Sequence, residues 1–309
     1  MMSGVTAGII WGVVILGLWW LGRRNSNKAK IAEDRPQQSY DVFTREFDCE
    51  IRARDLPAQL ALDRTEGEDP RGDYEREPAR REKAFAQAFS AARSKLAPRQ
   101  RDLSGTAICF LLDMSGSMAP RLPALLGELR GILEWSRENG AKSAALGFTT
   151  RGWRGGLPRK LWVEQGRPEY PGRLCALMHV TISNFDESDK QTDWNAVLRP
   201  DVLRENIDGE ALLWAAAQVE KIEAERRLLV ILSDGAPADD STIQANGVSF
   251  LTRGLSAAID QIENRTDLEL HGVGLSYRVH EFYGSAHHIA DGESLSNVID
   301  PIFQAGEQP

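Results

Sequence analysis

The chain has 309 residues, of which 42% are hydrophobic and 27% are charged, and its formal net charge is −8. This length and composition suit one large globular domain with extensions. The acidic balance gives no support to nucleic-acid binding, which needs a basic patch or stripe. The three cysteines are an odd number without metal-ligand spacing, so we expect the soluble part to reside in a reducing compartment.

The N-terminal residues 4–22 form an apolar run that contains no charged side chain. A run of about 19 residues is long enough to span a bilayer as a helix. Trp19 and Trp20 suit an interfacial position, and basic residues begin at Arg23. The positive-inside rule then predicts a single-pass anchor over residues 1–22 in the inner or cell membrane, with the soluble domain in the cytoplasm. A cleaved signal peptide would need basic residues before the run and a small-residue cleavage site after it, and the sequence has neither.

The next segments are polar and charged. Residues 23–39 read as a polar tether, and residues 40–103 as a charged helical and linker region. Within it, residues 64–82 are dense in both charge signs and indicate an exposed linker or a frayed helix. Apolar residues then recur at spacings of four, three and four: Phe85, Phe89, Ala92 and Leu96. This spacing predicts an amphipathic helix that packs on the main domain or on a partner.

Residues 104–309 alternate between apolar runs and helical patterns. The runs at residues 106–112, 143–148, 228–232 and 268–274 predict strands. Helices are expected near residues 122–139, 209–222, 251–262 and 295–302. Residues 151–204 look irregular, with a possible edge strand at 161–163. The alternation predicts an α/β fold, a doubly wound and mostly parallel sheet with helices on both faces, preceded by the N-terminal transmembrane helix.

Acidic and hydroxyl side chains follow two of these predicted strands. Asp113, Ser115 and Ser117 come directly after the run at 106–112, and Asp234 follows the run at 228–232. Parallel strands deliver such residues to one sheet edge, where α/β proteins bind ligands. Carboxylate and hydroxyl oxygens suit Mg²⁺ or another hard divalent cation better than zinc or copper. The alternative is that each Asp only caps the turn or helix that follows it.

The pattern DxSxS after a buried strand, with a later strand ending in SDG, resembles the von Willebrand factor A (vWA) domain and its metal-ion-dependent adhesion site (MIDAS). Longer motifs narrow the resemblance to the C-terminal vWA domain of the cobaltochelatase CobT subunit. These motifs are GFTTRGW at 147–153, PGRL at 171–174, ENIDGEAL at 205–212 and SDGAPADDST at 233–242. The segment YDVFTREFD at 40–48 also resembles the opening of that family's C-terminal region.

The resemblance implies a third loop that completes the metal site, and most vWA domains supply a threonine there. The corresponding stretch is 206–212, in which Glu210 best matches the threonine position and Asp208 is the rival. Both acidic residues would also be accounted for by the preference of helix N-termini for negative charge. A carboxylate in place of threonine would make the site more negative and favour a tightly held divalent ion.

The CobT resemblance implies a non-catalytic partner of an AAA+ ATPase, acting with a chelatase large subunit that inserts cobalt into a corrin ring in cobalamin biosynthesis. The sequence has no P-loop and no nucleophile elbow, so we expect no ATP hydrolysis by this chain alone. Two departures from the family are the membrane anchor and the short segment between residues 49 and 104. They leave open a second interpretation, a vWA adaptor for a different AAA+ machine or surface complex.

Two smaller features have alternative interpretations. Residues 151–156 form a basic, glycine-rich loop with Trp153, and Trp and Arg dominate the energetics of many interfaces. The loop could equally be a stiff connector with Trp153 folded over the core. Asp239 and Asp240 are more consistent with a surface turn than with a second layer of the site.

Overall fold

The computed structural model describes residues 31–35, 39–63, 77–186, 192–265 and 267–304. The predicted anchor at residues 1–22 and much of the predicted tether lie outside these ranges. Within them, no helix is both long and apolar enough to cross a membrane. The predicted N-terminal transmembrane helix therefore stays a prediction.

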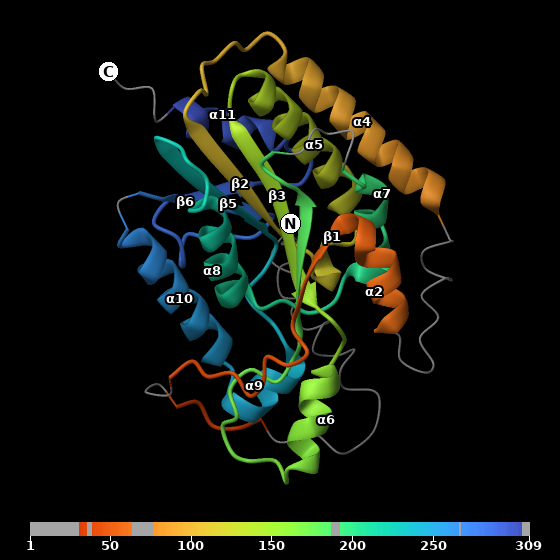
Figure 1. Cartoon of the computed structure of the whole chain (residues 1–309), viewed down its shortest axis with the longest axis vertical. Coiled ribbons are helices and arrows are strands. Elements are labelled where there is room, and N and C mark those ends of the chain that lie inside the picture. Colours follow the sequence, from red (N-terminus) through yellow and green to blue (C-terminus); the bar gives the residue numbers. More distant parts are fainter. Residues whose placement is uncertain (1–30, 36–38, 64–76, 187–191, 266, 305–309) are drawn as a thin grey trace, which may run out of the picture.

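The described residues build one mixed, mostly parallel sheet with the strand order β1-β4-β3-β2-β5-β6-β7 (Figure 1). Neighbouring strands pair in parallel, except for the antiparallel pair of β3 and β4. The strands are β1 (Cys49–Arg52), β2 (Thr106–Asp113), β3 (Lys142–Thr150), β4 (Leu177–Ser183), β5 (Arg226–Ser233), β6 (Glu269–Leu275) and β7 (Ala286–Ile289). The predicted α/β class with a mostly parallel sheet is confirmed.

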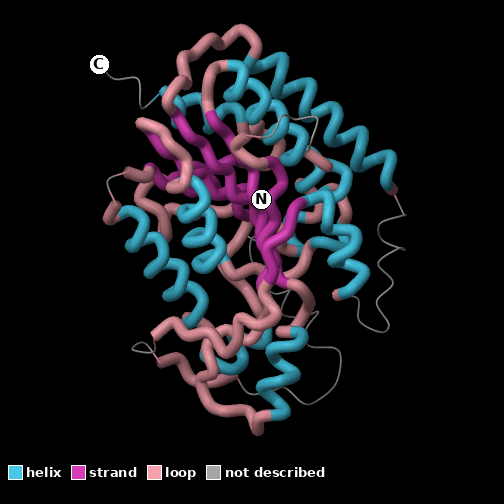
Figure 2. Tube along the Cα trace, in the orientation of Figure 1, coloured by secondary structure: helices cyan, strands magenta, loops and turns pink. Residues whose placement is uncertain are grey.

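Helices cover both faces of the sheet (Figures 1 and 2). The α-helices are α2 (Leu56–Leu62), α4 (Pro78–Leu96), α5 (Leu122–Glu138), α6 (Gly156–Glu164), α7 (Trp194–Val197), α8 (Asp208–Val219), α9 (Asp240–Asn246), α10 (Phe250–Glu263) and α11 (Ser296–Gln304). Short 3₁₀ turns are η1 (Ala53–Asp55), η2 (Gly116–Met118) and η4 (Pro200–Val202).

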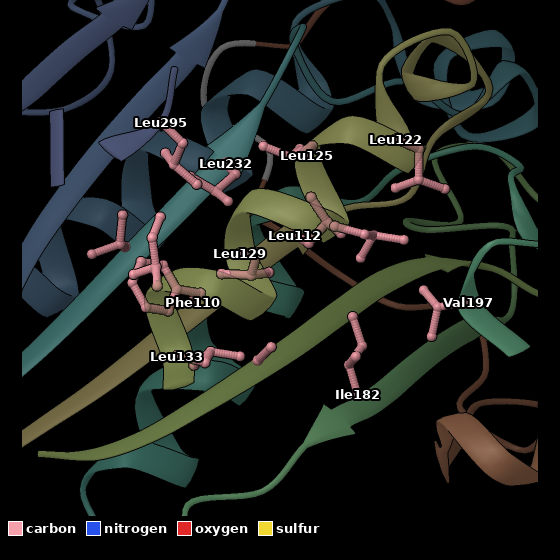
Figure 3. Packing of buried hydrophobic residues seen from close by; sticks show 14 of the residues in the cluster. Phe110, Leu112, Leu122, Leu125, Leu129, Leu133, Ile182, Val197, Leu232 and Leu295 are labelled. Carbon is pink, nitrogen blue, oxygen red and sulfur yellow. The ribbon is translucent and has the colours of Figure 1, made fainter. Parts of the chain in front are cut away.

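The central strand β2 explains why the core has two halves. All eight of its residues are buried, and successive side chains point to opposite faces. Phe110 and Leu112 pack with Leu129 and Leu133 of α5 on one face (Figure 3). On the other face, Leu111 belongs to a cluster with residues of α8 and α10. A strand buried on both faces reads as a continuous apolar run, which is why the sequence predicted it.

The amphipathic helix predicted near Phe85 is α4, and it lies against α5 as an outer layer (Figure 1). Residues 64–82 were expected to be an exposed linker or a frayed helix, and residues 78–82 form the start of α4. Residues 64–76 lie outside the described residues. Phe85 and Ala92 of α4 are buried in this contact.

Two predictions between residues 151 and 204 were wrong. The expected edge strand at 161–163 is part of the helix α6. The stretch also contains an unpredicted strand, β4, which pairs antiparallel with β3. Its side chains His179 and Thr181 are only partly buried, so β4 lacks the continuous apolar run that revealed β2 and β5.

Candidate metal centre

Asp113 is the last residue of β2, and its carboxylate is fixed from two sides. The backbone N–H of Ser115 donates to Oδ1 at 2.8 Å, and the hydroxyl of Ser233 donates to Oδ2 at 2.9 Å. The side chain is fully buried. The pKa of Asp113 is raised to about 6, mainly because the side chain is buried; the charge of Asp234 contributes to this rise, and the hydrogen bonds from Ser233 and Ser115 oppose it.

The two serines that follow β2 lie at the start of η2, with Ser115 directly before the turn and Ser117 within it. The hydroxyls of Ser115 and Ser117 lie 3.0 Å apart, and the Ser117 hydroxyl donates to Oδ1 of Asp234 at 2.7 Å. Asp234 directly follows β5, the parallel neighbour of β2. Because Ser117 is exposed while Asp113 is buried, this cluster connects the core to solvent. Hydrogen bonds thus link these four residues into one cluster.

Asp208 supplies a third carboxylate from the first turn of α8. It is buried, and the side-chain amide of Asn206 donates to its Oδ2 at 2.8 Å. Burial raises the pKa of Asp208 well above its usual value, and the charges of Asp113 and Asp234 raise it further. Asp208 is therefore near enough to Asp113 and Asp234 for their charges to act on it.

Glu210 has different partners. Its Oε1 lies 2.5 Å from Nε of Arg173 and accepts the hydroxyl proton of Tyr40 at 2.9 Å, and its Oε2 pairs with Arg45. Burial raises the pKa of Glu210, but the charges of Arg173 and Arg45 outweigh burial and lower it. With its carboxylate engaged by two arginines, Glu210 is a weaker candidate for the third-loop ligand than Asp208.

The donor set fits a hard divalent cation. It combines the carboxylates of Asp113, Asp208 and Asp234 with the hydroxyls of Ser115 and Ser117, and such oxygen donors are those that Mg²⁺ prefers. Among the described residues, no group of three or more His, Cys, Asp or Glu side chains is arranged to hold a metal by itself. A cation here would therefore depend on the hydroxyls as well, and metal binding stays a prediction.

Two residues that border the centre were not singled out from the sequence. Ser233 holds Asp113, and its place directly before Asp234 was the available signal. Arg121 donates from Nη1 to the carbonyl of Leu275 at 2.7 Å, and its Nε lies 3.9 Å from Oδ2 of Asp234. Its position before α5 gave no such indication, since the contact joins distant parts of the chain.

A second carboxyl pair lies close to the centre and corrects an expectation. Asp239, expected in a surface turn, is fully buried and accepts the N–H of Thr242 at 2.7 Å as the N-cap of α9. Burial, followed by the charge of Asp239, raises the pKa of Glu205 to about 9. The Glu205 carboxyl also accepts the N–H groups of Arg154 and Asp240 at 2.7 and 3.0 Å. This pair joins the loop before α6 to the start of α9.

The comparison with protein families identifies the domain that carries this cluster. Residues 97–302 match the family described as the cobalamin biosynthesis protein CobT VWA domain. The match covers more than half of the chain, and it contains β2, β5 and the first turn of α8, which carry the centre. It confirms the resemblance inferred from the sequence motifs. The chain therefore belongs to the CobT VWA domain family of cobalamin biosynthesis proteins.

Proposed function

We propose that this chain is a membrane-anchored, Mg²⁺-dependent and non-catalytic partner of an AAA+ ATPase in a cobaltochelatase-type complex. The observation that carries the proposal is the cluster of carboxylates and hydroxyls around Asp113 at the carboxyl edge of the sheet, open to solvent at Ser117. A cation held there would keep a coordination position for a carboxylate of the partner.

The neighbourhood of the cluster supports binding rather than catalysis. Asp113 is buried and its carboxylate oxygens accept hydrogen bonds from Ser115 and Ser233. Such a carboxylate is positioned to organise a site rather than to exchange protons with a substrate. When bound, the ion supplies positive charge for a partner carboxylate, and the serine hydroxyls and aspartates hold the ion in place.

A second candidate function is a vWA adaptor for a different AAA+ machine or surface complex. The apolar run at residues 4–22 favours it, because the family resemblance does not imply a membrane anchor. Both functions predict Mg²⁺-dependent capture of a partner protein, which in the first function is an AAA+ subunit. They differ in whether a chelatase large subunit joins the assembly.

The test is co-purification of the full chain in detergent with candidate AAA+ subunits and a chelatase large subunit from the same organism. We expect capture of one AAA+ subunit in Mg²⁺ and its release in EDTA. Asp113→Ala should abolish capture. The matched control is Asp102→Ala, since Asp102 is an exposed carboxylate that precedes the N-terminal end of β2, whereas Asp113 ends the strand. Capture that is equal in Mg²⁺ and EDTA, or ATP turnover by the isolated chain, would refute the proposal. Capture of the AAA+ subunit without the chelatase large subunit would favour the second candidate.

A further inference from the structure

The loop that follows β3 places a half-exposed tryptophan beside the metal centre. A Cβ atom added to Gly116, which separates Ser115 from Ser117, would come within 2.9 Å of the Trp153 ring. The guanidinium of Arg204 lies 6.0 Å from the centroid of the same ring. Trp153 is nevertheless 46% exposed. The sequence left open whether this ring folds over the core, and the structure places it at the rim of the centre instead.

The backbone of this loop is held firmly, although its side chains face solvent. The Thr150 hydroxyl donates to the carbonyl of Gly152 at 2.9 Å, and the N–H of Arg154 donates to Glu205 at 2.7 Å. Gly155 has a φ of +79°, and a Cβ there would come within 2.6 Å of the Leu174 carbonyl. A loop fixed in this way loses little conformational entropy when a partner binds.

The helix α6 extends the exposed surface away from the centre, at the carboxyl end of β3 (Figure 1). Leu157 is 52% exposed, and Lys160, three residues further on, lies on the same helical face and is also exposed. Exposed apolar side chains that lie together within a polar rim mark interaction sites, and Trp153 and Leu157 are four residues apart in the chain.

The charge of this surface is opposite to that of the whole chain. Residues 151–167 contain five basic residues and one acidic residue, whereas the chain has a net charge of −8. Arg154 and Lys160 form no ion pair with any residue in the described part of the chain. The exposed carboxylate of Asp240 lies on the neighbouring α9 and offsets part of this charge.

We infer that Trp153, Arg154, Leu157 and Lys160 form a docking surface for an acidic segment of the partner protein that carries an apolar side chain next to its carboxylates. The inference rests on the proposed function and specifies the chemistry of its partner. One partner carboxylate completes the shell of the ion, the apolar side chain packs on Trp153 and Leu157, and further carboxylates pair with Arg154 and Lys160. Complementary charge selects the partner and speeds association, while the aromatic side chain provides the anchor.

The test uses a short fluorescein-labelled peptide composed of Glu, Asp and Leu, and measures its anisotropy with the full chain in detergent. We expect wild type to bind this peptide in Mg²⁺, and Trp153→Ala to weaken binding by about tenfold or more. Lys160→Glu should weaken it as well. Both variants should keep the wild-type thermal shift with Mg²⁺, because neither side chain is a ligand of the ion.

Matched controls come from exposed residues elsewhere in the structure. Val248→Ala removes a side chain that is 59% exposed, and Lys83→Glu reverses an exposed charge on α4. Both should bind the peptide as wild type does. A peptide in which Lys replaces the acidic residues should bind Lys160→Glu better than wild type, since the charge pairing is then restored.

The experiment distinguishes results that contradict the docking surface from results that contradict the metal-dependent function. Wild-type affinity in both Trp153→Ala and Lys160→Glu would overturn the inference, as would no binding of the acidic peptide by wild type. Preference for phosphatidylserine vesicles over the peptide would overturn it too and indicate a membrane surface as the partner. Equal peptide binding in Mg²⁺ and EDTA, with Trp153→Ala still weakened, would refute the metal-dependent function and leave the docking surface standing.

Discussion

At the scale of single residues, Asp208 and Glu210 show how one helical turn serves two tasks. The two residues are two positions apart, which turns their side chains by roughly 200° around the axis of α8. Asp208 lies beside Asp113 and Asp234, whereas Glu210 pairs with Arg173, whose side chain is fully buried. Asp208 thus adds to a cluster of negative charges on one side of the turn, whereas the charge of Glu210 on the other side is neutralised by arginine.

This difference predicts distinct responses to Mg²⁺. A divalent ion relieves repulsion among the clustered carboxylates, and at a concentration of 100 times the dissociation constant it stabilises the fold by about 2.7 kcal/mol. Asp113→Ala should abolish this gain while leaving a folded domain, and Asp208→Asn should reduce it. Glu210→Gln should keep the Mg²⁺ response but lower stability by about 1.5–3 kcal/mol, because it weakens charge-assisted hydrogen bonds.

Melting temperature against Mg²⁺ concentration checks these expectations for wild type and the three variants. Asp102→Ala provides the control for removal of an exposed carboxylate. If Glu210→Gln loses the response and Asp208→Asn retains it, the assignment of the third-loop ligand is reversed. An unchanged response in Asp113→Ala would exclude the centre as described.

The pair of Glu205 and Asp239 predicts a loss of stability in mild alkali. The pKa of Glu205 is raised to about 9, first by burial and then by the charge of Asp239. Since the folded pKa lies above the unfolded value, the protonated carboxyl stabilises the fold at low pH, and that contribution is lost as pH rises toward 9. Glu205→Gln imitates the protonated carboxyl and cannot titrate.

Denaturant unfolding at pH 6, 7.5 and 9 measures this effect. We expect wild type to lose about 1–3 kcal/mol more of its free energy of unfolding than Glu205→Gln between pH 6 and 9. Parallel pH curves for the two proteins would show that Glu205 is ionised in the folded state at neutral pH.

At the scale of elements, the contact of α4 with α5 depends on two glycines one turn apart. A Cβ atom at Gly127 would clash with the carbonyl of Phe85, and one at Gly131 would come within 2.9 Å of the Ala92 Cβ. These glycines let the two helices approach closely. The ion pair of Arg93 with Glu138, at 2.8 Å, adds a polar contact at the far end of the same interface.

Gly127→Ala should therefore destabilise the protein, although alanine is the better helix former. The gain in helix propensity is about 1 kcal/mol, and it is opposed by about 1–3 kcal/mol of overpacking against a backbone that cannot move aside locally. We expect a net loss of about 1–2 kcal/mol in the free energy of unfolding. Gly152→Ala is the control, since nothing lies within 4 Å of the added methyl group, and it should stay within about 0.5 kcal/mol of wild type. Stabilisation by Gly127→Ala would mean that the helices are farther apart than described.

The strands that the sequence predicted are those buried along almost their whole length. Strand β2 is apolar on both faces, so its run was unambiguous. The triplet Leu161-Trp162-Val163 has side chains with high strand propensity, yet it lies in α6, which begins after the left-handed Gly155. Propensity alone could not show that this helix starts on a glycine turn held by long-range contacts.

In the candidate site, too, buried strands made the prediction possible. The sequence predicted that Asp113 and Asp234 lie at one sheet edge, because each stands at the carboxyl end of a buried parallel strand. It could not decide between Asp208 and Glu210, since the choice depends on the rotation of α8 about its axis. The partner of Glu210 is Arg173, which is distant in the chain and buried only after folding.

At the scale of the whole molecule, the segment before β1 is tied to the same end of the sheet as α9. The N–H of Ala32 donates to the carbonyl of Gln244 at 2.9 Å. Tyr40 stacks on Phe250 with ring centroids 5.0 Å apart, and Asp48 pairs with Arg173 at 2.6 Å. A membrane anchor upstream of Ile31 would therefore hold the domain by the end that carries the metal centre.

The anchor prediction can be tested without knowledge of the partner. The apolar run at residues 4–22, followed by Arg23, predicts that the full chain sediments with membranes, resists salt extraction and is released by detergent. A truncated chain that begins at Ile31 should be soluble and keep the wild-type Mg²⁺ thermal shift, since the run contributes no ligand.

Val14→Lys places a charge in the middle of the run, which costs about 2.5–3.5 kcal/mol on insertion, and should shift part of the protein to the soluble fraction. Val14→Leu is the matched control and should stay in the membrane. Protease added to intact cells should not cleave the domain, because the basic residues place it in the cytoplasm. Full-length protein that stays soluble without cleavage would refute the anchor, and a domain cleaved from outside would reverse its orientation.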